Sequence, residues 1–279
     1  MSDTLAIIGA SGRSGATLCR ALTQPFRAVV RDAAKWGALG IAAPHAVADL
    51  RDEASLRAAL TGASTIISCA HARHAPSVLA AAPPDARFVF MGSTRRHSRW
   101  PDAHGDGVRA GEAAFLASGR AGVMLHPTMI YGAEGEDNVQ RLAALMRRLP
   151  VLPLPGGGAA LVQPIHQDDV TQSLIAAAAR GNAAPEVTII AGPTPLAYRD
   201  FCAEVARAAG IPPRAVLPIP AGLLMALSPL TAALPFLPRI RPDEIRRLTE
   251  DKAFDITAMR ETLGVTPIPL AEGLARTFP

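Results

Sequence analysis

The stretch of residues 7–15 reads Ile-Ile-Gly-Ala-Ser-Gly-Arg-Ser-Gly, and it decides the fold. It ends a short apolar run and supplies Gly9, Gly12 and Gly15, after which apolar residues recur at helical spacing over 14–22. Glycines at these places allow a tight turn off a strand, a close approach of the backbone to a pyrophosphate, and close packing of the helix start on the sheet. The stretch therefore predicts a strand, a phosphate-binding turn and a helix, the beginning of a dinucleotide-binding domain.

The N-terminus of that helix supplies amide groups and the positive end of a dipole, and both favour phosphate oxygens. We expect the turn and the first helical residues to hold the phosphates of the cofactor. The residues expected in this contact are Gly9, Ser11, Gly12, Arg13, Ser14 and Gly15.

Outward from this stretch, short apolar runs alternate with segments of helical periodicity. Strands are expected at residues 5–8, 28–30, 46–48, 65–69, 88–91 and 123–126, and helices at 14–22, 53–60, 76–81 and 111–117. Continuous apolar strands separated by helices indicate a parallel sheet that is covered on both faces and joined by right-handed crossovers. The fold class is therefore α/β, a doubly wound, Rossmann-like parallel sheet.

The second half of the chain is punctuated by proline and glycine. We expect the cofactor-binding domain over 1–191 and a smaller, mostly helical substrate lobe over 192–279, to which 130–165 contributes in part. The segment 215–238 carries no charge and is long enough to cross a membrane, but five prolines break it. We expect a buried or pocket-lining pair of helices there, with contact to a membrane surface as the open alternative.

Composition excludes several classes of protein. The 279 residues are 49% hydrophobic, enough for a large core, and the arginines behind the net charge of +4 are dispersed, unlike a nucleic-acid footprint. Cys19, Cys69 and Cys202 form no disulfide or metal pattern, and His71 and His74 lack a third ligand. We therefore expect no metal, no nucleic-acid partner, a cytoplasmic location, and a monomer or homodimer that binds a small molecule.

The residues about 20 positions beyond the glycines discriminate between NAD and NADP. Arg31 stands at the end of the second strand, where an NAD site places a carboxylate, and Arg13 lies within the glycine turn. Two guanidinium groups near one ribose favour a 2′-phosphate. We expect NADP(H), while the neighbouring Asp32 keeps NAD(H) possible.

Further motifs follow the strands at regular intervals. They are Val-Arg-Asp at 30–32, Ala-Asp-Leu at 48–50, Ile-Ser-Cys-Ala at 67–70, Phe-Val-Phe-Met-Gly-Ser at 88–93, His-Pro-Thr-Met-Ile-Tyr-Gly at 126–132, Gln-Pro-Ile-His-Gln-Asp-Asp-Val at 163–170 and Arg-Leu-Thr-Glu-Asp-Lys at 247–252. With the glycine turn, they resemble the extended and atypical, epimerase-like branch of the short-chain dehydrogenase/reductase superfamily over nearly the whole chain. The resemblance implies further cofactor contacts: Asp49 and Leu50 at the adenine, Cys69 and Ala70 in the cleft, and Pro127, Thr128 and Met129 beside the nicotinamide. His126 stands where the family often has arginine.

The proton-transfer dyad of that family is missing from this sequence. The family uses a tyrosine with a lysine four residues later to protonate the developing alkoxide. Only Tyr131 and Tyr198 are tyrosines, and the residues four positions beyond them are glycine and cysteine. Counting back from Glu112 places His104 at the tyrosine position, and Ser93 follows the fifth strand at the family's serine position.

Three explanations stay open. In the preferred one, the protein is an oxidoreductase acting on a small carbonyl or apolar substrate, with Ser93 and His104 as catalytic residues, since histidine titrates in the right range. The competing interpretation of the two residues is a capping serine and an exposed loop histidine. Alternatively, the protein binds NADP(H) without turnover, as a sensor or an assembly or structural subunit. A sugar-nucleotide epimerase or dehydratase is the weakest reading, because such reactions depend most on the missing dyad.

Overall fold

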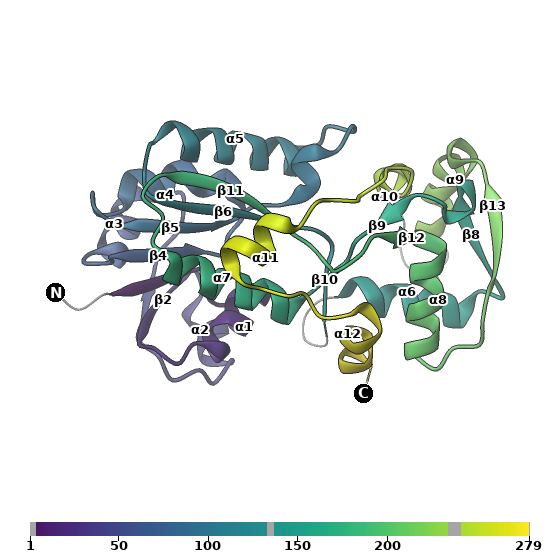
Figure 1. The fold of residues 1–279 in the computed structure, drawn as a ribbon, viewed down its shortest axis with the longest axis horizontal. Helices are drawn as coiled ribbons and strands as arrows, with labels where there is room; N and C mark the ends of the chain where they lie inside the picture. The colour runs from purple at the N-terminus through teal and green to yellow at the C-terminus, as the bar shows by residue number, and fades with distance from the viewer. Residues whose placement is uncertain (1–3, 133–136, 234–240, 279) are drawn as a thin grey trace.

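The glycine turn joins the first strand of the main sheet to its first helix, as its sequence predicts. The computed structural model describes residues 4–132, 137–233 and 241–278. Within them lie a large parallel sheet with helices on both faces and, at its carboxyl edge, a smaller lobe (Figure 1).

Seven parallel strands form the sheet in the order β11-β6-β5-β4-β1-β2-β3. They are β1 (Leu5–Ile8), β2 (Phe26–Val30), β3 (His45–Val47), β4 (Thr65–Ser68), β5 (Arg87–Met91), β6 (Gly122–Pro127) and β11 (Pro185–Ile190). The chain winds from β1 toward β3 and then, from β4 onward, in the other direction. The reversal lies between β1 and β4, where a crevice opens at the carboxyl ends of the strands in doubly wound sheets. This confirms the fold class expected from the sequence.

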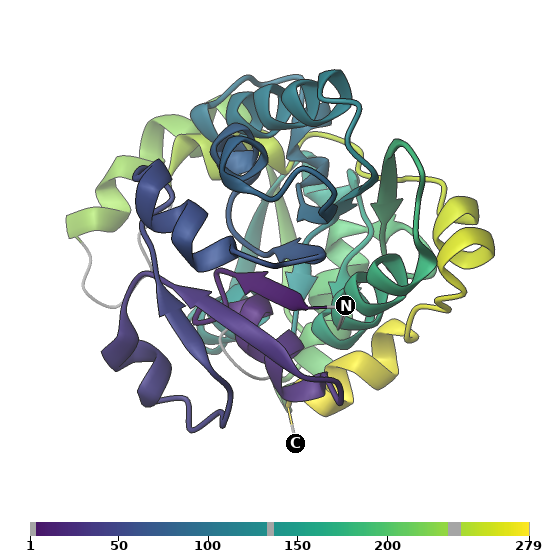
Figure 2. The same ribbon diagram turned by 90° about the vertical axis from the view of Figure 1, so that its left-hand side faces the viewer.

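Two helical layers cover the sheet (Figure 2). One contains α1 (Arg13–Ala21), α7 (Gln167–Arg180) and α11 (Thr257–Leu263), and the other α3 (Glu53–Leu60), α4 (Ala75–Ala81) and α5 (Ala103–Ala117). Alternate residues of β1 supply the two cores, since Leu5 and Ile7 pack with the first layer and Ala6 and Ile8 with the second. Because both faces of the sheet are buried, the sequences of its strands are continuous apolar runs.

Aspartate side chains determine where several helices begin. Asp32, Asp52 and Asp102 precede α2 (Ala33–Gly37), α3 and α5, and each side chain accepts a hydrogen bond from a first-turn amide. Such N-caps satisfy amides that have no partner within the helix. Short 3₁₀ helices, η1 (Ala72–His74) and η2 (Thr94–His97), follow β4 and β5 at the carboxyl edge.

The smaller lobe has a third core, formed mainly by α6 and α8. Its helices are α6 (Asp137–Arg148), α8 (Tyr198–Ala208), α9 (Ala221–Leu227), α10 (Pro242–Arg247) and α12 (Leu270–Thr277), with the 3₁₀ helices η3 (Gly156–Gly158) and η4 (Ser228–Ala233). Three strand pairs complete the region: β7 (Ile130–Tyr131) with β10 (Ile165–His166), β8 (Val151–Pro155) with β13 (Ala215–Ile219), and β9 (Leu161–Val162) with β12 (Leu196–Ala197). Residues 137–166 therefore join the later segments in one lobe.

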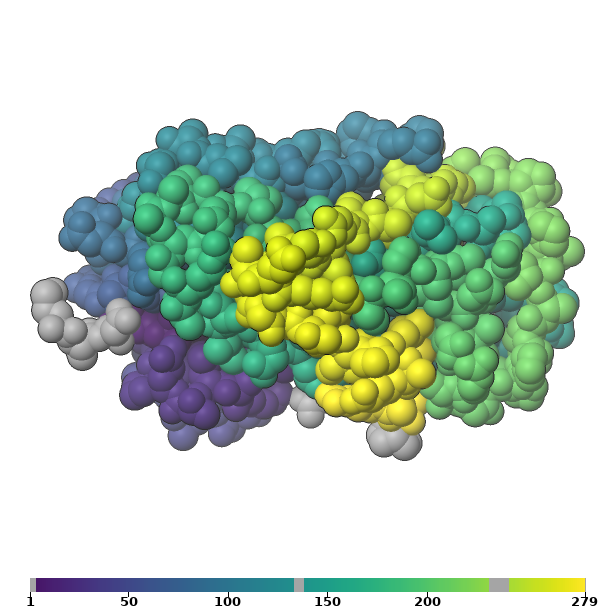
Figure 3. Space-filling model, viewed as in Figure 1, coloured from purple at the N-terminus to yellow at the C-terminus, as the bar shows by residue number. Residues whose placement is uncertain are grey.

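The C-terminal segment returns to the large sheet before it ends. Helix α11 packs on α7 and β11, with Met259 and Leu263 in the sheet core, and α12 then packs on α8 of the lobe. Figure 3 shows this segment in yellow across the junction of the two parts. A domain boundary at residue 191 stays a proposal, since α11 lies beyond it and packs on the first domain.

The expectation of a buried or pocket-lining helix pair over 215–238 is wrong for the described residues, and residues 234–238 lie outside them. The segment forms β13, the short helix α9 and η4, and no residue of α9 is buried. Leu223 and Leu227, one turn apart on α9, are 52% and 46% exposed, and Leu230 in η4 is 60% exposed. The lobe core is already filled from α6 and α8, so these leucines point outward. Within the described residues, each helix is too short or too polar to cross a lipid bilayer.

Candidate functional site

The glycine turn is built so that two of its positions accept glycine alone. Gly9 has a φ of +73°, in the left-handed region that glycine favours. A Cβ at Gly15 would lie 2.2 Å from the carbonyl oxygen of Gly9, and Gly12 donates its N–H to the same oxygen. The N-cap Gly12 has no capping side chain, so the start of α1 is open to phosphate oxygens. The turn thus fits a dinucleotide pyrophosphate.

Two residues expected in the cofactor cleft lie directly against this turn. A Cβ on Gly9 would lie 3.2 Å from the backbone nitrogen of Ala70, and Cys69 donates its N–H to Ile8 at 3.0 Å. Burial raises the pKa of the Cys69 thiol to about 12, so it stays protonated and packs rather than reacts. The end of β4 is therefore one wall of the crevice beside β1.

The expected adenosine end lies at the neighbouring strand ends. Arg31 follows β2 and is exposed, whereas Asp32 accepts the N–H of Lys35 at 3.0 Å as the cap of α2. Beyond β3, Asp49 accepts the N–H of Arg51, and Leu50 is partly buried against the sheet core. One oxygen of the Asp32 carboxylate is thus engaged in helix capping, and Arg31 and Asp32 are both exposed.

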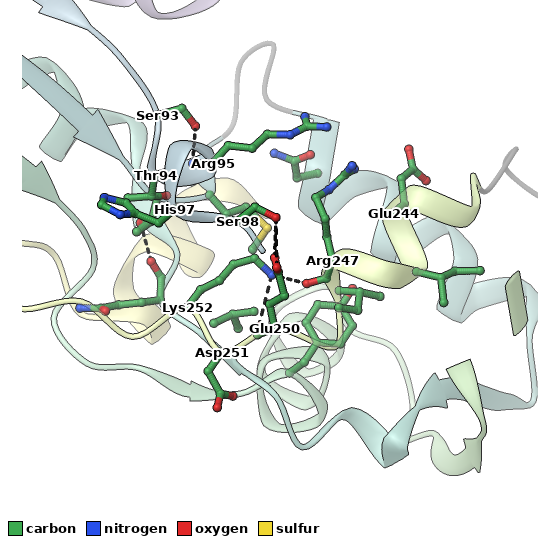
Figure 4. A pocket seen from close by; sticks show the side chains of 18 of the residues that line it. Ser93, Thr94, Arg95, His97, Ser98, Glu244, Arg247, Glu250, Asp251 and Lys252 are labelled. Carbon is green, nitrogen blue, oxygen red and sulfur yellow. Dashed lines mark hydrogen bonds between the residues drawn. The ribbon is translucent and has the colours of Figure 1, made fainter. Parts of the chain in front are cut away.

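A cavity of about 800 Å³ lies beyond the ends of β5 and β6 (Figure 4). Four residues singled out in the sequence line it together: Ser93, His104, Thr128 and Met129. Pro127 does not line the cavity, but its carbonyl accepts the hydroxyl of Thr94 at 3.2 Å. Further walls come from η2 and residues 98–99, from α6, β9, α8 and α10, and from the segment 248–254 after α10, so the cavity lies between the two parts of the molecule.

Ser93 caps η2, because its Oγ accepts the N–H of Arg95 at 3.2 Å. That bond uses Oγ as an acceptor and leaves the O–H able to donate into the cavity. The Thr128 hydroxyl, by contrast, donates to the carbonyl of Gln163. Ser93 is therefore both the capping residue of the competing interpretation and a usable donor.

His104 lies in the first turn of α5 and is half-buried, rather than in an exposed loop. Its ring meets the ring of His71 edge to face, with centroids 4.3 Å apart. Burial, and next the positive charge of Arg95, lower the pKa of His104 below its ordinary value. The imidazole is neutral at pH 7 and can exchange hydrogen bonds, but the acid form is scarce. Among the described residues, His71 and His74 belong to no group of three potential metal ligands.

Sequence reasoning missed a buried polar network beneath Ser93. His126 is fully buried; its Nδ1 accepts the N–H of Ser93 at 2.9 Å, and its Nε2 lies 2.6 Å from Oε2 of Glu112. Arg96 Nε lies 2.8 Å from the same oxygen. Burial lowers the pKa of His126 to about 3 and raises the pKa of Glu112. His126 is thus neutral with its proton on Nε2, and the network fixes the backbone at the cavity edge.

The sequence contains one sign of this network, the His-Pro pair at 126–127, because the related family often has arginine in place of the histidine. A second mark is Gly92, where a Cβ would lie 2.3 Å from Nδ1 of His126. The histidine therefore occupies space that only a glycine in β5's extension leaves open. Neither His126 nor Gly92 indicates, from the sequence alone, that Glu112 is the partner of the histidine.

No protein-family model matches the chain. It is 26% identical over 204 residues to a 3beta-hydroxysteroid-dehydrogenase/decarboxylase isoform 1 of Arabidopsis thaliana, and the match covers 64% of this chain and 46% of that protein. The chain thus spans about half the length of this curated relative.

Solved structures resemble the chain over nearly its whole length. An NADPH-dependent quinone oxidoreductase of Escherichia coli, solved with NADPH, has a TM-score of 0.78 at 19% identity, covering 99% of this chain and 100% of that one. A UDP-glucose 4-epimerase of Thermotoga maritima has a TM-score of 0.74 at 15% identity, with 99% and 97% covered. A UDP-glucuronic acid 4-epimerase of Bacillus cereus, solved with NAD, gives the same values, a TM-score of 0.74 at 15% identity with 99% and 97% covered. The chain therefore has the Rossmann-like fold of the extended, epimerase-like short-chain dehydrogenases/reductases, as its sequence motifs predict.

Proposed function

We propose that this protein is an NADP(H)-dependent oxidoreductase acting on a small carbonyl compound. The observation that carries the proposal is that the glycine turn and the cavity lie at the same, carboxyl edge of the parallel sheet. The turn requires glycine and fits a pyrophosphate, and Ser93, Thr128 and Met129, which follow β5 and β6, line a cavity of about 800 Å³. A bound nicotinamide would supply the hydride, and the residues around the cavity would position the carbonyl.

The chain's own residues have defined tasks in this proposal. Ser93 donates its O–H to the substrate oxygen, and the Glu112–His126 pair holds the backbone that carries Ser93. His104 is neutral at pH 7, so it orients the substrate by a hydrogen bond and delivers a proton only from its minor acid form. If His104 is the proton donor, kcat rises as the pH falls from 7 toward its lowered pKa.

The preference for NADP(H) rests on Arg31 and Asp32. Asp32 is engaged as the cap of α2, and Arg31 is exposed at the end of β2. We expect Arg31→Ala to weaken NADPH binding about tenfold or more and to leave NADH binding unchanged. The control is Arg207→Ala, an exposed arginine on α8 in the lobe. Equal effects on the two cofactors would show that Arg31 does not read the 2′-phosphate.

Turnover is tested by following NADPH consumption with a panel of aldehydes, ketones and quinones, for the wild type and Ser93→Ala. The proposal expects turnover on part of the panel and a fall in kcat of about a hundredfold in the variant, the usual scale for a lost donor at a reacting oxygen. Tight NADPH binding with no turnover on any substrate would support the second candidate, an NADP(H)-binding sensor or structural subunit. The feature that favours this candidate is the neutral His104 at the position that counting along the sequence assigns to the family's tyrosine. Turnover of a nucleotide sugar alone would support the epimerase or dehydratase reading.

A further inference from the structure

The cavity contains an arginine whose guanidinium finds no hydrogen-bond acceptor among the described residues. Arg247 ends α10 and lines the cavity, and its side chain is 25% exposed. Its nearest carboxylate oxygen, Oδ2 of Asp102, is 3.9 Å away, too far for a hydrogen bond. Among the described residues, the guanidinium has no hydrogen-bond acceptor. A half-buried cation in this state favours an anionic ligand.

Asp102 cannot neutralise Arg247, because its carboxylate is already engaged. Its Oδ2 accepts Arg95 Nε at 2.8 Å as well as Arg95 Nη2, and its Oδ1 accepts the N–H of Gly105 at 2.8 Å. Two guanidinium groups therefore share one carboxylate. Figure 4 shows Arg95 and Arg247 extending toward the same side of the cavity. Burial, and next the charge of Arg95, lower the pKa of Arg247, as expected where positive charge is in excess.

The other carboxylates of the wall are also engaged elsewhere. Glu250 accepts the hydroxyl of Ser98 at 2.9 Å and the N–H of Arg99 at 2.7 Å. Asp251 accepts the N–H of Leu161 at 2.8 Å, and Glu244 accepts the N–H of Arg241 in the cap of α10. None of these three carboxylates lies within 4 Å of the Arg247 guanidinium in the described structure. The positive charge of Arg247 is therefore not neutralised by these carboxylates, and this part of the cavity is positively charged.

Apolar side chains form much of the remaining wall. They are Met129, Leu142, Leu145, Val162, Ile245, Leu248 and Phe254. Such a surface suits hydrocarbon, whereas a guanidinium fork suits a carboxylate or phosphate. A ligand that satisfies both has an apolar body and one anionic end.

We propose that Arg247 binds the anionic end of the substrate, a carboxylate or phosphate on an apolar body. The carbonyl of that substrate would face Ser93, and this part rests on the proposed function. The anion site itself does not, since it requires only the cavity and the unsatisfied arginine. An amphiphilic oxo acid, or the phosphate ester of a hydroxy ketone, is the resulting substrate class.

The test is isothermal titration of the full chain, saturated with NADP⁺ so that the phosphate sites of the cofactor are filled. The probes are hexanoate, hexyl phosphate and uncharged hexanol. At least one anion should bind the wild type more tightly than hexanol, and Arg247→Met should weaken that binding about tenfold or more while leaving hexanol unchanged. The comparison of the two anions distinguishes a carboxylate site from a phosphate site.

The matched control is Arg246→Met. Arg246 is the neighbouring arginine on α10, lies over the ring of Trp100 and does not line the cavity. Arg247→Lys keeps the charge without the fork, and an intermediate affinity is expected. If circular dichroism shows that Arg247→Met is not folded, the anion affinity of Arg247→Lys tests the proposal in its place.

Equal anion affinity in the wild type and both Arg247 variants, equal weakening by Arg246→Met, or anion binding no tighter than hexanol would overturn the anion site. Arg247-dependent anion binding in a protein that turns over no carbonyl substrate would reject the oxidoreductase proposal and keep the anion site. Turnover of uncharged carbonyl compounds without anion binding would reject the anion site and keep the oxidoreductase proposal.

Discussion

His126 makes the stability of this protein depend on pH. The side chain is 0% exposed and is held between the N–H of Ser93, at 2.9 Å, and Oε2 of Glu112, at 2.6 Å. Burial, and next the charges of Arg96 and His97, lower the pKa of His126 from 6.5 to about 3. In the folded protein the ring therefore stays neutral at a pH where the unfolded chain is protonated. A change of His126 to an uncharged residue should remove this dependence.

The size of the effect follows from the two pKa values. Below pH 6.5 the unfolded state binds one proton more than the native state, so stability falls as the pH falls, by about 1.4 kcal/mol per pH unit. Between pH 6.5 and pH 4.5 this amounts to about 3 kcal/mol for one group. Burial raises the pKa of Glu112, which acts in the opposite direction because the native state then takes up a proton first. The dependence on His126 is therefore read from the difference between wild type and variant.

The assay is urea unfolding at several pH values from 4.5 to 7.5. His126→Gln keeps a donor toward Glu112, and His126→Asn keeps an acceptor toward the N–H of Ser93. Both should be less stable than the wild type at pH 7.5, and the difference should shrink by about 3 kcal/mol at pH 4.5. His45→Gln, at an exposed position of β3, is the control. Parallel pH curves for the wild type and both variants would refute the reasoning.

Four further substitutions test separate parts of the structure. Gly15→Ala places a Cβ 2.2 Å from the Gly9 oxygen and should weaken NADPH binding at least about tenfold by fluorescence titration. Gly37→Ala, with no atom within 4 Å, should leave binding intact and stabilise α2 by about 0.5–1 kcal/mol. Gly273→Ala would bring a Cβ to 2.1 Å from the Tyr131 hydroxyl and should lower the unfolding free energy by about 1–3 kcal/mol, of which Tyr131→Phe restores a part. Leu223→Asp should change the unfolding free energy by less than about 0.5 kcal/mol, and a larger loss would mean that the outward face of α9 is covered.

The fold could be predicted because its signals are local. The glycines at 9–15 and each apolar run that forms a strand lie within a few consecutive residues of the sequence. Parallel strands, in addition, must bring their carboxyl ends to one edge of the sheet. For that reason Ser93 and Thr128 meet at one cavity although they follow different strands, β5 and β6.

The rest depends on contacts between distant segments. The sequence shows that 215–238 is apolar, but not which way α9 faces, since an i, i+4, i+7 pattern fits a buried or an outward stripe. The pairing of His126 with Glu112 and the excess charge at Arg247 arise only once helices and strands are packed. The placement of His104 in a helix was partly accessible, because Asp102 is a good N-cap two residues before it.

The central claim is that the glycine turn and Arg31 bind NADP(H), and the most direct measurement is the dissociation constant of the wild-type protein for NADPH and for NADH by calorimetry. The account predicts one site per chain and at least about tenfold tighter binding of NADPH, the scale of one charge-assisted phosphate contact. Binding of neither cofactor would contradict the assignment of the site, and equal binding of both would contradict the role of Arg31.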